Sequence, residues 1–375
     1  MKIKHKICHV ITRLDAGGVG KVTRTLAKEF VRQGHEVMII CLTNQSPPTL
    51  KTDIEARGIR VIEVDNNRMS APASIAKTMQ AFFALFKDHR DITHLICPGV
   101  NYASLAIPPA KILRHKTKII VNAHTNFSAY AAGKGLAFRL WQKINRFILA
   151  KADRIANDSQ GAADDLKTFF KLRRVDAIYN PITTPEDLAF KEKKADAPHE
   201  WLRDKSLLNF VSCGRFIESK NFGFMLDVFA RIHAAHPHAR LILIGKGPEE
   251  ETLKAQVQSL GITDAVHFAG FVDDPKVYFY HADYFWLTSL YEGFSMVLGE
   301  ALSMGTPCIS NDCPSGPREV LEGGKYGLLI EDYDLAHNTS EILAFLKQER
   351  NSREFYRTRT QGFLISEIAT QYLEP

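Results

Sequence analysis

The sequence predicts an α/β protein built from two Rossmann-like domains, each with a doubly wound parallel sheet. Three observations lead to this fold class. The length of 375 residues suits two domains, short apolar runs alternate with segments of helical periodicity, and that alternation stops once near the middle and then starts again. Since ligands bind beyond the carboxyl ends of the strands in such sheets, we expect the two domains to face a central cleft.

Five apolar or β-branched runs in the first half are predicted strands. They cover residues 6–12, 35–42, 59–64, 93–97 and 118–124. Between the first two runs, residues 21–34 have helical periodicity and end at Gly34, a residue typical of a helix C-terminus. The alternation predicts an N-terminal Rossmann-like domain over residues 1–182.

The pattern breaks over residues 179–201, where prolines, charged residues and alanines replace it. This composition predicts an interdomain linker over 183–205. Six further predicted strands follow, at residues 207–214, 239–247, 265–271, 282–289, 307–312 and 326–330. They predict a second Rossmann-like domain over 206–351, and the last stretch is a predicted helix.

Composition narrows the class of protein. Of the residues 45% are hydrophobic and 24% charged, and the formal net charge is +6, which permits an anionic partner. No apolar run approaches the roughly 18 residues that a membrane-spanning helix needs. The six cysteines are scattered without a C-x-x-C pair, which predicts a cytoplasmic protein. The basic residues are dispersed and no nucleic-acid-binding motif is present, so we expect no nucleic-acid partner.

Two glutamates in residues 287–312 are the first candidate site residues. Glu292 lies in a glycine-flanked loop after a predicted strand, and Glu300 follows on the next helix, about two turns away. A helix that begins at the carboxyl end of a strand offers free N–H groups and a positive dipole end, which suit a phosphate or a sugar. The spacing alone is also typical of a solvated helix face, but the surrounding strand, loop and small residues favour a ligand site.

The second half opens with two basic candidates, Arg215 and Lys220. Arg215 follows the first strand of that half, and Lys220 precedes its first helix. A guanidinium can bind a diphosphate in a forked geometry, and an ammonium adds a point charge. Solvated side chains are the alternative, which the downstream glutamates make less favourable.

A glycine-rich loop follows the first predicted strand. It contains Gly17, Gly18 and Gly20. Glycines at the start of a helix allow the backbone to approach a phosphate or a sugar. An ATPase phosphate loop is disfavoured because Val22 stands where Ser or Thr is needed and Asp15 where a glycine is needed. A dinucleotide fingerprint fails because Thr23 replaces its last glycine. A plain tight turn remains the alternative.

Together, the E-x7-E spacing, the G-R-x-x-x-x-K-N segment after residue 213 and the GG-V loop resemble retaining nucleotide-sugar glycosyltransferases of family four, which have the two-domain GT-B fold. The resemblance spans nearly the whole chain and is strongest from residue 214 to 330. It implies that a C-terminal helix at about 352–375 packs back on the first domain. Residues 314–330 are similar to bacterial enzymes that build lipopolysaccharide, capsule or lipid-linked glycans.

The resemblance also implies roles for single residues. Glu292 and His124 are the expected catalytic residues, with His124 hydrogen-bonding the donor sugar from the end of a strand; a structural histidine is the open alternative. The expected donor-binding residues are Gly17, Gly18, Arg215, Lys220, Gly245, Phe271, Val272, Gly293, Phe294, Ser295, Val297 and Glu300. Among them, Arg215 and Lys220 would hold the diphosphate, Glu300 the ribose, and the turn around residues 270–272 the nucleobase.

The function implied is transfer of a hexose or hexosamine from a nucleotide diphosphate sugar, expected to be a UDP-sugar, to a glycan hydroxyl with retention of configuration. No cofactor or metal is expected, because the one D-x-D string, Asp332 to Asp334, follows the last strand. Two alternatives stay open. One is a nucleotide-sugar epimerase of similar fold, and the other is a non-catalytic nucleotide-sugar-binding subunit.

The acceptor is expected, by family analogy alone, to be a glycan or lipid-linked glycan at the cytoplasmic face of the inner membrane. The predicted helix at 135–150 bears on this point. Its apolar stripe consists of Leu136, Leu140, Ile144, Phe147 and Ile148, with Arg139, Lys143 and Arg146 on other sides. Such a stripe suits a membrane interface, but packing on the sheet is the favoured interpretation.

Overall fold

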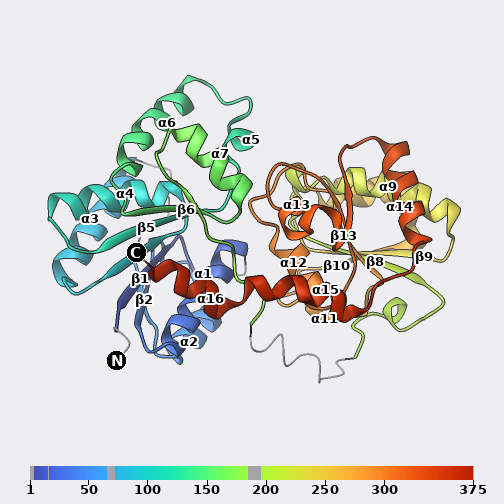
Figure 1. Cartoon of the computed structure of the whole chain (residues 1–375), viewed down its shortest axis with the longest axis horizontal. Helices are drawn as coiled ribbons and strands as arrows, with labels where there is room; N and C mark the ends of the chain where they lie inside the picture. Colours follow the sequence, from blue (N-terminus) through green and yellow to red (C-terminus); the bar gives the residue numbers. More distant parts are fainter. Residues whose placement is uncertain (1–3, 16, 66–71, 185–195, 375) are drawn as a thin grey trace. The chain divides into compact units, whose positions relative to one another are not determined.

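The computed structural model describes residues 4–15, 17–65, 72–184 and 196–374. The chain forms two compact units. The first comprises Met1–Pro181 with Ile365–Pro375, and the second comprises Ile182–Leu364. Figure 1 shows a sheet with helices on both faces in each unit, as the sequence predicts. No helix in the described ranges combines the length and apolar character required to cross a membrane.

The first unit contains a seven-stranded parallel sheet in the order β3-β2-β1-β4-β5-β6-β7. The strands are β1 Lys6–Ile11, β2 Glu36–Cys41, β3 Arg60–Glu63, β4 His94–Cys97, β5 Lys118–Ala123, β6 Arg154–Asn157 and β7 Asp176–Ala177. The helices are α1 Gly18–Arg32, α2 Pro48–Glu55, α3 Pro72–Asp88, α4 Val100–Ile112, α5 Phe127–Ala131, α6 Leu136–Leu149, α7 Gln160–Phe170 and α16 Ile365–Leu373. All five predicted strands are confirmed. The sequence missed β6 and β7, which are short and begin with charged residues.

The second unit contains a six-stranded parallel sheet in the order β10-β9-β8-β11-β12-β13. The strands are β8 Leu208–Cys213, β9 Ala239–Ile244, β10 Val266–Gly270, β11 Tyr284–Leu287, β12 Cys308–Asn311 and β13 Gly327–Ile330. The helices are α9 Phe222–Ala235, α10 Glu250–Ser259, α11 Lys276–His281, α12 Met296–Ser303, α13 Pro317–Val320, α14 Leu335–Leu346 and α15 Arg353–Arg359. All six predicted strands are present.

Each sheet has one point where the strand order reverses. In the first unit it lies between β1 and β4, and in the second between β8 and β11. Connections on the two sides of this point run to opposite faces of the sheet, which leaves a crevice beyond the carboxyl ends of the two strands. These two places are therefore where each unit is best able to hold a ligand.

The unit boundaries differ from the expected domain limits. Residues 185–195 of the expected linker lie outside the described residues, but the part after them packs into the second unit. There the His199 and His267 rings lie 4.3 Å apart, and Asn209 Nδ2 donates to the Trp201 carbonyl at 2.9 Å. This end of the expected linker is therefore held by the fold of the second unit.

The expected C-terminal helix at 352–375 is divided in the structure. Its first part, α15, packs against α12 in the second unit. Its second part, α16, packs against α1 in the first unit, where Tyr372 is buried and its hydroxyl hydrogen-bonds Asn122. The division falls at Leu364, whose backbone is extended and ends the helical path.

The favoured interpretation of the α6 stripe is wrong. Four of its five members are exposed: Leu136 by 81%, Leu140 by 60%, Ile144 by 51% and Phe147 by 70%. The buried side of α6 contains Asn145 and Leu149 instead, with Trp141 and Ile148 packed against the core. Asn145 explains this orientation, because it hydrogen-bonds Ser104 of α4 and would lose that partner if the helix were rotated. The helix is apolar on two sides, so periodicity alone could not identify the inner one.

A buried histidine makes the first unit sensitive to acid. His9 lies on the central strand β1 at 1% exposure, and within the described structure its Nε2 has no hydrogen-bond partner. Burial lowers the pKa of His9 to about 3 from its ordinary value of 6.5. Below pH 6.5 the unfolded chain therefore binds a proton that the folded chain does not, so stability is complete above that pH and is lost as pH falls towards 3.

We expect the free energy of unfolding to fall by about 2 kcal/mol between pH 6.5 and 5 on account of His9. Urea unfolding at several pH values measures this loss. His9→Leu should remove that part of the slope, and His89→Leu, at a half-buried histidine of the same unit, should leave it in place. Equal slopes in wild type and His9→Leu would show that His9 is not the acid-sensitive group.

Candidate functional site

The reversal point of the second sheet holds an ion pair between two of the expected site residues. Lys220 ends a short 3-10 helix after β8, and Glu292 lies in the loop after β11. Lys220 Nζ is 2.6 Å from Glu292 Oε1. Because β8 and β11 are neighbours in the sheet, their two loops meet across the crevice that the topology creates there.

The loop around Glu292 is held by several further hydrogen bonds. Ser289 Oγ donates to Glu292 Oε1 at 2.6 Å, and Tyr333 Oη donates to the Ser289 carbonyl at 2.5 Å. Thr288 Oγ1 donates to the Lys220 carbonyl at 3.1 Å, which connects the two loops a second time. Both side-chain partners of Glu292 bind the same oxygen, so Oε2 faces no hydrogen-bond donor among the described residues and is available for a ligand.

Backbone hydrogen bonds join the carboxyl ends of β8, β9 and β10, and we call this hydrogen-bonded backbone the floor of the site. Gly245 N donates to the Gly270 carbonyl at 2.8 Å, and Phe216 N donates to the Lys246 carbonyl at 3.0 Å. Gly245 has a φ of +144°, and a Cβ there would lie 1.9 Å from the Gly214 carbonyl oxygen. Only glycine therefore permits the two strand ends to approach this closely.

Two other expected donor-binding residues stand at this floor. Arg215 lies two residues after the end of β8 and is exposed, and its side chain makes no hydrogen bond or ion pair with any described residue. Phe271 follows β10 and is 56% exposed, with the partly buried Val272 beside it. The exposed guanidinium follows β8 and the exposed aromatic ring follows β10, at the same edge of the sheet with β9 between them. They suit a phosphate and a flat base respectively.

The backbone turns at Ser295, three residues after Glu292, and α12 begins there. Ser295 is in the left-handed region at a φ of 64°, is buried, and its Oγ has no hydrogen-bond partner among described residues. A Cβ on Gly316 would lie 3.0 Å from the Phe294 carbonyl oxygen, so the neighbouring loop also needs glycine to pack here. Gly293 precedes this turn, and Val297 lies in the first turn of α12.

Glu300 is the fifth residue of α12, and it is buried at only 3% exposure. Glu292 is buried as well. Two buried glutamates contradict the alternative of a solvated helix face, since buried carboxylates need specific partners. The structure thus brings Glu292 and Lys220 together at the reversal point, and the turn before α12 and the buried Glu300 follow Glu292 in the chain.

The expected residues of the first unit lie on separate elements there. His124 follows β5, and its Nδ1 is 3.2 Å from Asp158 Oδ2. Asn180 Nδ2 donates to the same Asp158 oxygen at 3.0 Å. Gly17 caps α1 and Gly18 is its first residue, and both are exposed.

Asp158 orients the imidazole of His124 and was not predicted from the sequence. The signal was available but weak, because Asp158 follows the unpredicted strand β6 and thus ends beside β5. His124 also borders a cavity of about 460 Å³. The aromatic residues in its wall are Tyr102, Phe127, Tyr130, Phe138 and Trp141.

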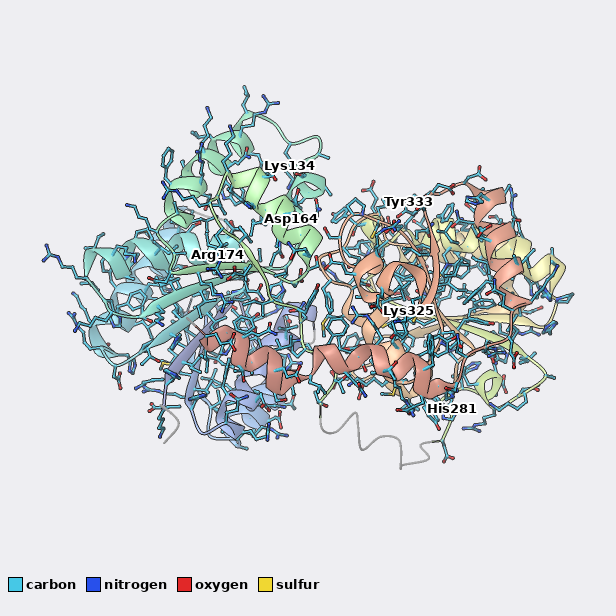
Figure 2. All side chains as sticks on the ribbon, in the orientation of Figure 1. Lys134, Asp164, Arg174, His281, Lys325 and Tyr333 are labelled. Carbon is cyan, nitrogen blue, oxygen red and sulfur yellow. The ribbon has the colours of Figure 1, made fainter. Side chains whose placement is uncertain are left out.

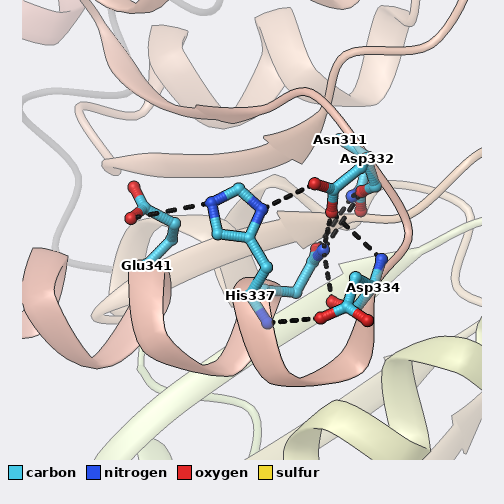
Figure 3. Close-up of polar contacts among 6 residues, drawn as sticks. Asn311, Asp332, Asp334, His337 and Glu341 are labelled. Carbon is cyan, nitrogen blue, oxygen red and sulfur yellow. Dashed lines mark hydrogen bonds and ion pairs between the residues drawn. The ribbon is translucent and has the colours of Figure 1, made fainter.

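The D-x-D string serves as a helix cap (Figure 3). Asp334 Oδ1 accepts a hydrogen bond from the His337 backbone N–H at 2.7 Å, and Asp332 Oδ2 is 2.6 Å from His337 Nδ1. The hydrogen bond to Asp332 raises the pKa of His337 above its ordinary value, and hydrogen bonding to the Asp334 N–H holds the pKa of Asp332 below its own. These two carboxylates therefore already have partners at the start of α14.

Two protein-family sequence models match the chain, one for each half. Residues 16–185 match Glycosyltransferase Family 4, and residues 194–361 match Glycosyl transferases group 1. The two matched ranges leave out only the ends of the chain and the segment between the units.

Curated relatives resemble most of the chain. An N-acetylgalactosamine-N,N'-diacetylbacillosaminyl-diphospho-undecaprenol 4-alpha-N-acetylgalactosaminyltransferase of Campylobacter jejuni is 27% identical over 73% of this chain and 73% of its own length. An N-acetyl-alpha-D-glucosaminyl L-malate synthase of Bacillus anthracis is 25% identical over 96% of this chain and 93% of its own.

Solved structures share the fold over nearly the full length. Anabaena HepE, in complex with UDP and glucose, has a TM-score of 0.75 at 18% identity and covers 98% of both chains. The apo form of the lipopolysaccharide outer core galactosyltransferase WaaB has a TM-score of 0.71 at 21% identity, with 98% of this chain and 99% of the other covered. These likenesses, with the two parallel sheets, establish the GT-B fold.

Proposed function

Since this chain belongs to the GT-B glycosyltransferases with a family 4 N-terminal half and a group 1 C-terminal half, we propose that it transfers a hexose or hexosamine from a UDP-sugar to a glycan hydroxyl. We propose that the configuration at the anomeric carbon is retained. The observation that carries this proposal is the Lys220–Glu292 pair at the reversal point of the second sheet, beside the exposed Arg215.

The residues around the pair suit the departure of a nucleoside diphosphate. Arg215 and Lys220 supply two positive charges at the carboxyl edge of the sheet, where the leaving group would gain negative charge as its bond to the sugar breaks. The backbone floor around Gly245 allows close approach of the nucleotide, and Phe271 offers a ring face to the uracil. With this positive charge supplied by side chains, we propose that the reaction needs no metal.

Glu292 is better suited to stabilising charge than to attacking the sugar. Its Oε1 is already bound by an ammonium and a hydroxyl, which lowers the nucleophilicity of the carboxylate. We therefore propose attack by the acceptor hydroxyl on the face of the leaving group. The bond from the anomeric carbon to the phosphate oxygen breaks, the bond to the acceptor oxygen forms, and that oxygen's proton passes to the diphosphate. Glu292 then steadies positive charge at the anomeric carbon, while Glu300 binds the ribose.

The first unit would supply the acceptor side. We assign His124, held by Asp158, to a hydroxyl of the donor sugar, and the Gly17–Gly18 backbone to the closing loop. The aromatic cavity beside His124 suits the apolar faces of a sugar ring. The Campylobacter relative is named for a diphospho-undecaprenol substrate, which supports a lipid-linked glycan as acceptor. We propose the cytoplasmic face of the inner membrane as the place of reaction.

A panel of nucleotide sugars tests the proposal. UDP-glucose, UDP-galactose, UDP-N-acetylglucosamine, UDP-N-acetylgalactosamine and GDP-mannose are each incubated with the protein and EDTA, and binding and slow hydrolysis are measured. We expect one UDP-sugar to bind and to be hydrolysed. Binding of none would contradict the proposal and favour a non-catalytic subunit. Release of a new sugar isomer without acceptor would favour an epimerase, and turnover that requires a divalent metal would contradict the metal-free step.

A further inference from the structure

The outer side of α6 carries an apolar stripe with a basic border. At about 100° per residue, Leu136, Leu140, Ile144 and Phe147 fall on one narrow side of the helix. Arg139, Lys143 and Arg146 fall along one edge of that stripe. All four apolar side chains are at least half exposed, although burial of such side chains is normally favourable. The opposite side of the helix packs against α4 and α7 (Figure 1), and its Trp141 ring lies near Phe127 of α5.

Positive charge is concentrated around this helix. Residues 92–152 contain nine lysines and arginines and no aspartate or glutamate, so this segment carries +9. The whole chain carries +6, so the remaining residues together carry −3. At the start of α6, Lys134 (Figure 2) stands 3.4 Å from the ring centre of the exposed Tyr130. The basic residues are therefore not dispersed as the sequence analysis assumed.

A cavity of about 740 Å³ opens at the other end of α6. Arg146 and Phe147 line it together with the exposed cations Lys118, Lys171 and Arg173. Arg146 and these three cations have no ion-pair partner among described residues. The cavity thus joins the end of the apolar stripe to a cluster of free positive charge.

The carboxylates that border this cavity are mostly engaged elsewhere. Asp176 is bound by Arg154 and by Arg174 (Figure 2), each at 2.7 Å. Asp153 accepts the Ile119 backbone N–H at 2.8 Å, and Glu374 is the third acid in the wall. Six basic residues against three acids leave the cavity positive, which suits a phosphate group.

We propose that the outer side of α6 docks on an anionic phospholipid bilayer, with lipid phosphates held by the cations of the adjoining cavity. An exposed apolar stripe beside a basic border is the arrangement that binds the headgroup boundary of such membranes. A second copy of this chain is a poor occupant, since a symmetric contact would bring two segments of +9 together.

This inference deepens the proposed lipid-linked acceptor, and in that respect it rests on the proposed function. Phe138 and Trp141 on the inner side of α6 line the cavity beside His124. The helix therefore separates a bilayer on its outer side from the acceptor cavity on its inner side. The glycan of a lipid-linked acceptor would enter that cavity while its lipid stays in the bilayer.

Co-sedimentation with vesicles tests the proposal. Full-length protein is mixed with vesicles of phosphatidylcholine alone, and of phosphatidylcholine with phosphatidylglycerol. We expect binding to the anionic vesicles only, weakening as salt is raised. L140S/I144S should lower the binding constant at least tenfold, because two exposed apolar side chains are lost. K143Q/R146Q should lower it by about tenfold, because two charges near the surface are lost.

Two matched controls isolate the surface. Ile75→Ser removes an apolar side chain that is 43% exposed on α3, and K205Q/R231Q removes two exposed charges from the second unit. Both should bind vesicles like wild type. Absence of vesicle binding by wild type, or equal binding by L140S/I144S, would overturn the proposal. A dimer seen by light scattering and abolished by L140S/I144S, without vesicle binding, would assign the face to self-association instead.

The outcome is separable from that of the proposed function. Donor hydrolysis in solution should be the same in L140S/I144S as in wild type, since neither side chain lines the cavity beside His124. Vesicle binding without any donor turnover would leave the membrane surface standing and overturn the glycosyltransferase proposal. Donor turnover without vesicle binding would support the glycosyltransferase proposal and overturn the membrane surface.

Discussion

Replacing Glu292 with glutamine is expected to lower kcat of sugar transfer by about 10²–10³-fold, the loss typical of removing one charge-stabilising group from a transition state. Glutamine keeps the size of the side chain, and Ser289 Oγ can still donate to its amide oxygen. What is lost is the negative charge beside the anomeric carbon, which becomes positive as the diphosphate leaves. Since that positive charge is small in the bound donor, binding of the donor should change little.

The two effects are measured separately, kcat from initial rates with the donor that the panel identifies, and donor affinity by calorimetry. Glu331→Gln, at a carboxylate that is 78% exposed beyond β13, is the matched control and should behave like wild type. Wild-type kcat in Glu292→Gln would remove the proposed role. Loss of donor affinity in proportion to kcat would instead assign Glu292 to ground-state binding.

Replacing Gly245 with alanine is expected to destabilise the second unit by about 3 kcal/mol or more, which combines backbone strain with overpacking. The added Cβ would lie 1.9 Å from the Gly214 carbonyl oxygen, and the φ of +144° is one that side chains rarely allow. The strand ends would have to separate, and the Gly245 N–H bond to the Gly270 carbonyl would weaken. Donor binding should fall together with stability, because the same backbone forms the floor of the site.

Gly261→Ala is the matched control for this change. Gly261 also has a positive φ, of +67°, but a Cβ there would meet nothing within 4 Å, so only the backbone term of about 1 kcal/mol remains. Urea unfolding followed by tryptophan fluorescence, to which Trp201 and the buried Trp286 contribute from the second unit, measures both variants. Equal loss in the two variants would mean that the contact with residue 214 does not constrain the strand ends.

Local patterns were sufficient to locate most of the sheet. Runs of buried residues such as 241–244 are apolar throughout because a strand covered on both faces must be, and this holds wherever the strand lies in the sheet. The short strand β6, with Arg154 at its start and Asn157 at its end, has too few apolar residues to be recognised in this way. Asp158 was missed for the same reason, because its position beside His124 depends on that strand.

The sequence by itself determined the fold class, the eleven predicted strands and the residue types of the candidate site, because these follow from local composition and spacing. Only the tertiary structure decided that Lys220 and Glu292 meet, since their contact requires β8 and β11 to be neighbours at the point where the strand order reverses. It also decided which side of α6 is buried. A helix that is apolar on two sides turns inward the side whose polar residue finds a partner, and here Asn145 finds Ser104. Local patterns indicate whether a segment can form a strand or a helix, whereas burial and side-chain pairing depend on segments that are distant in the chain.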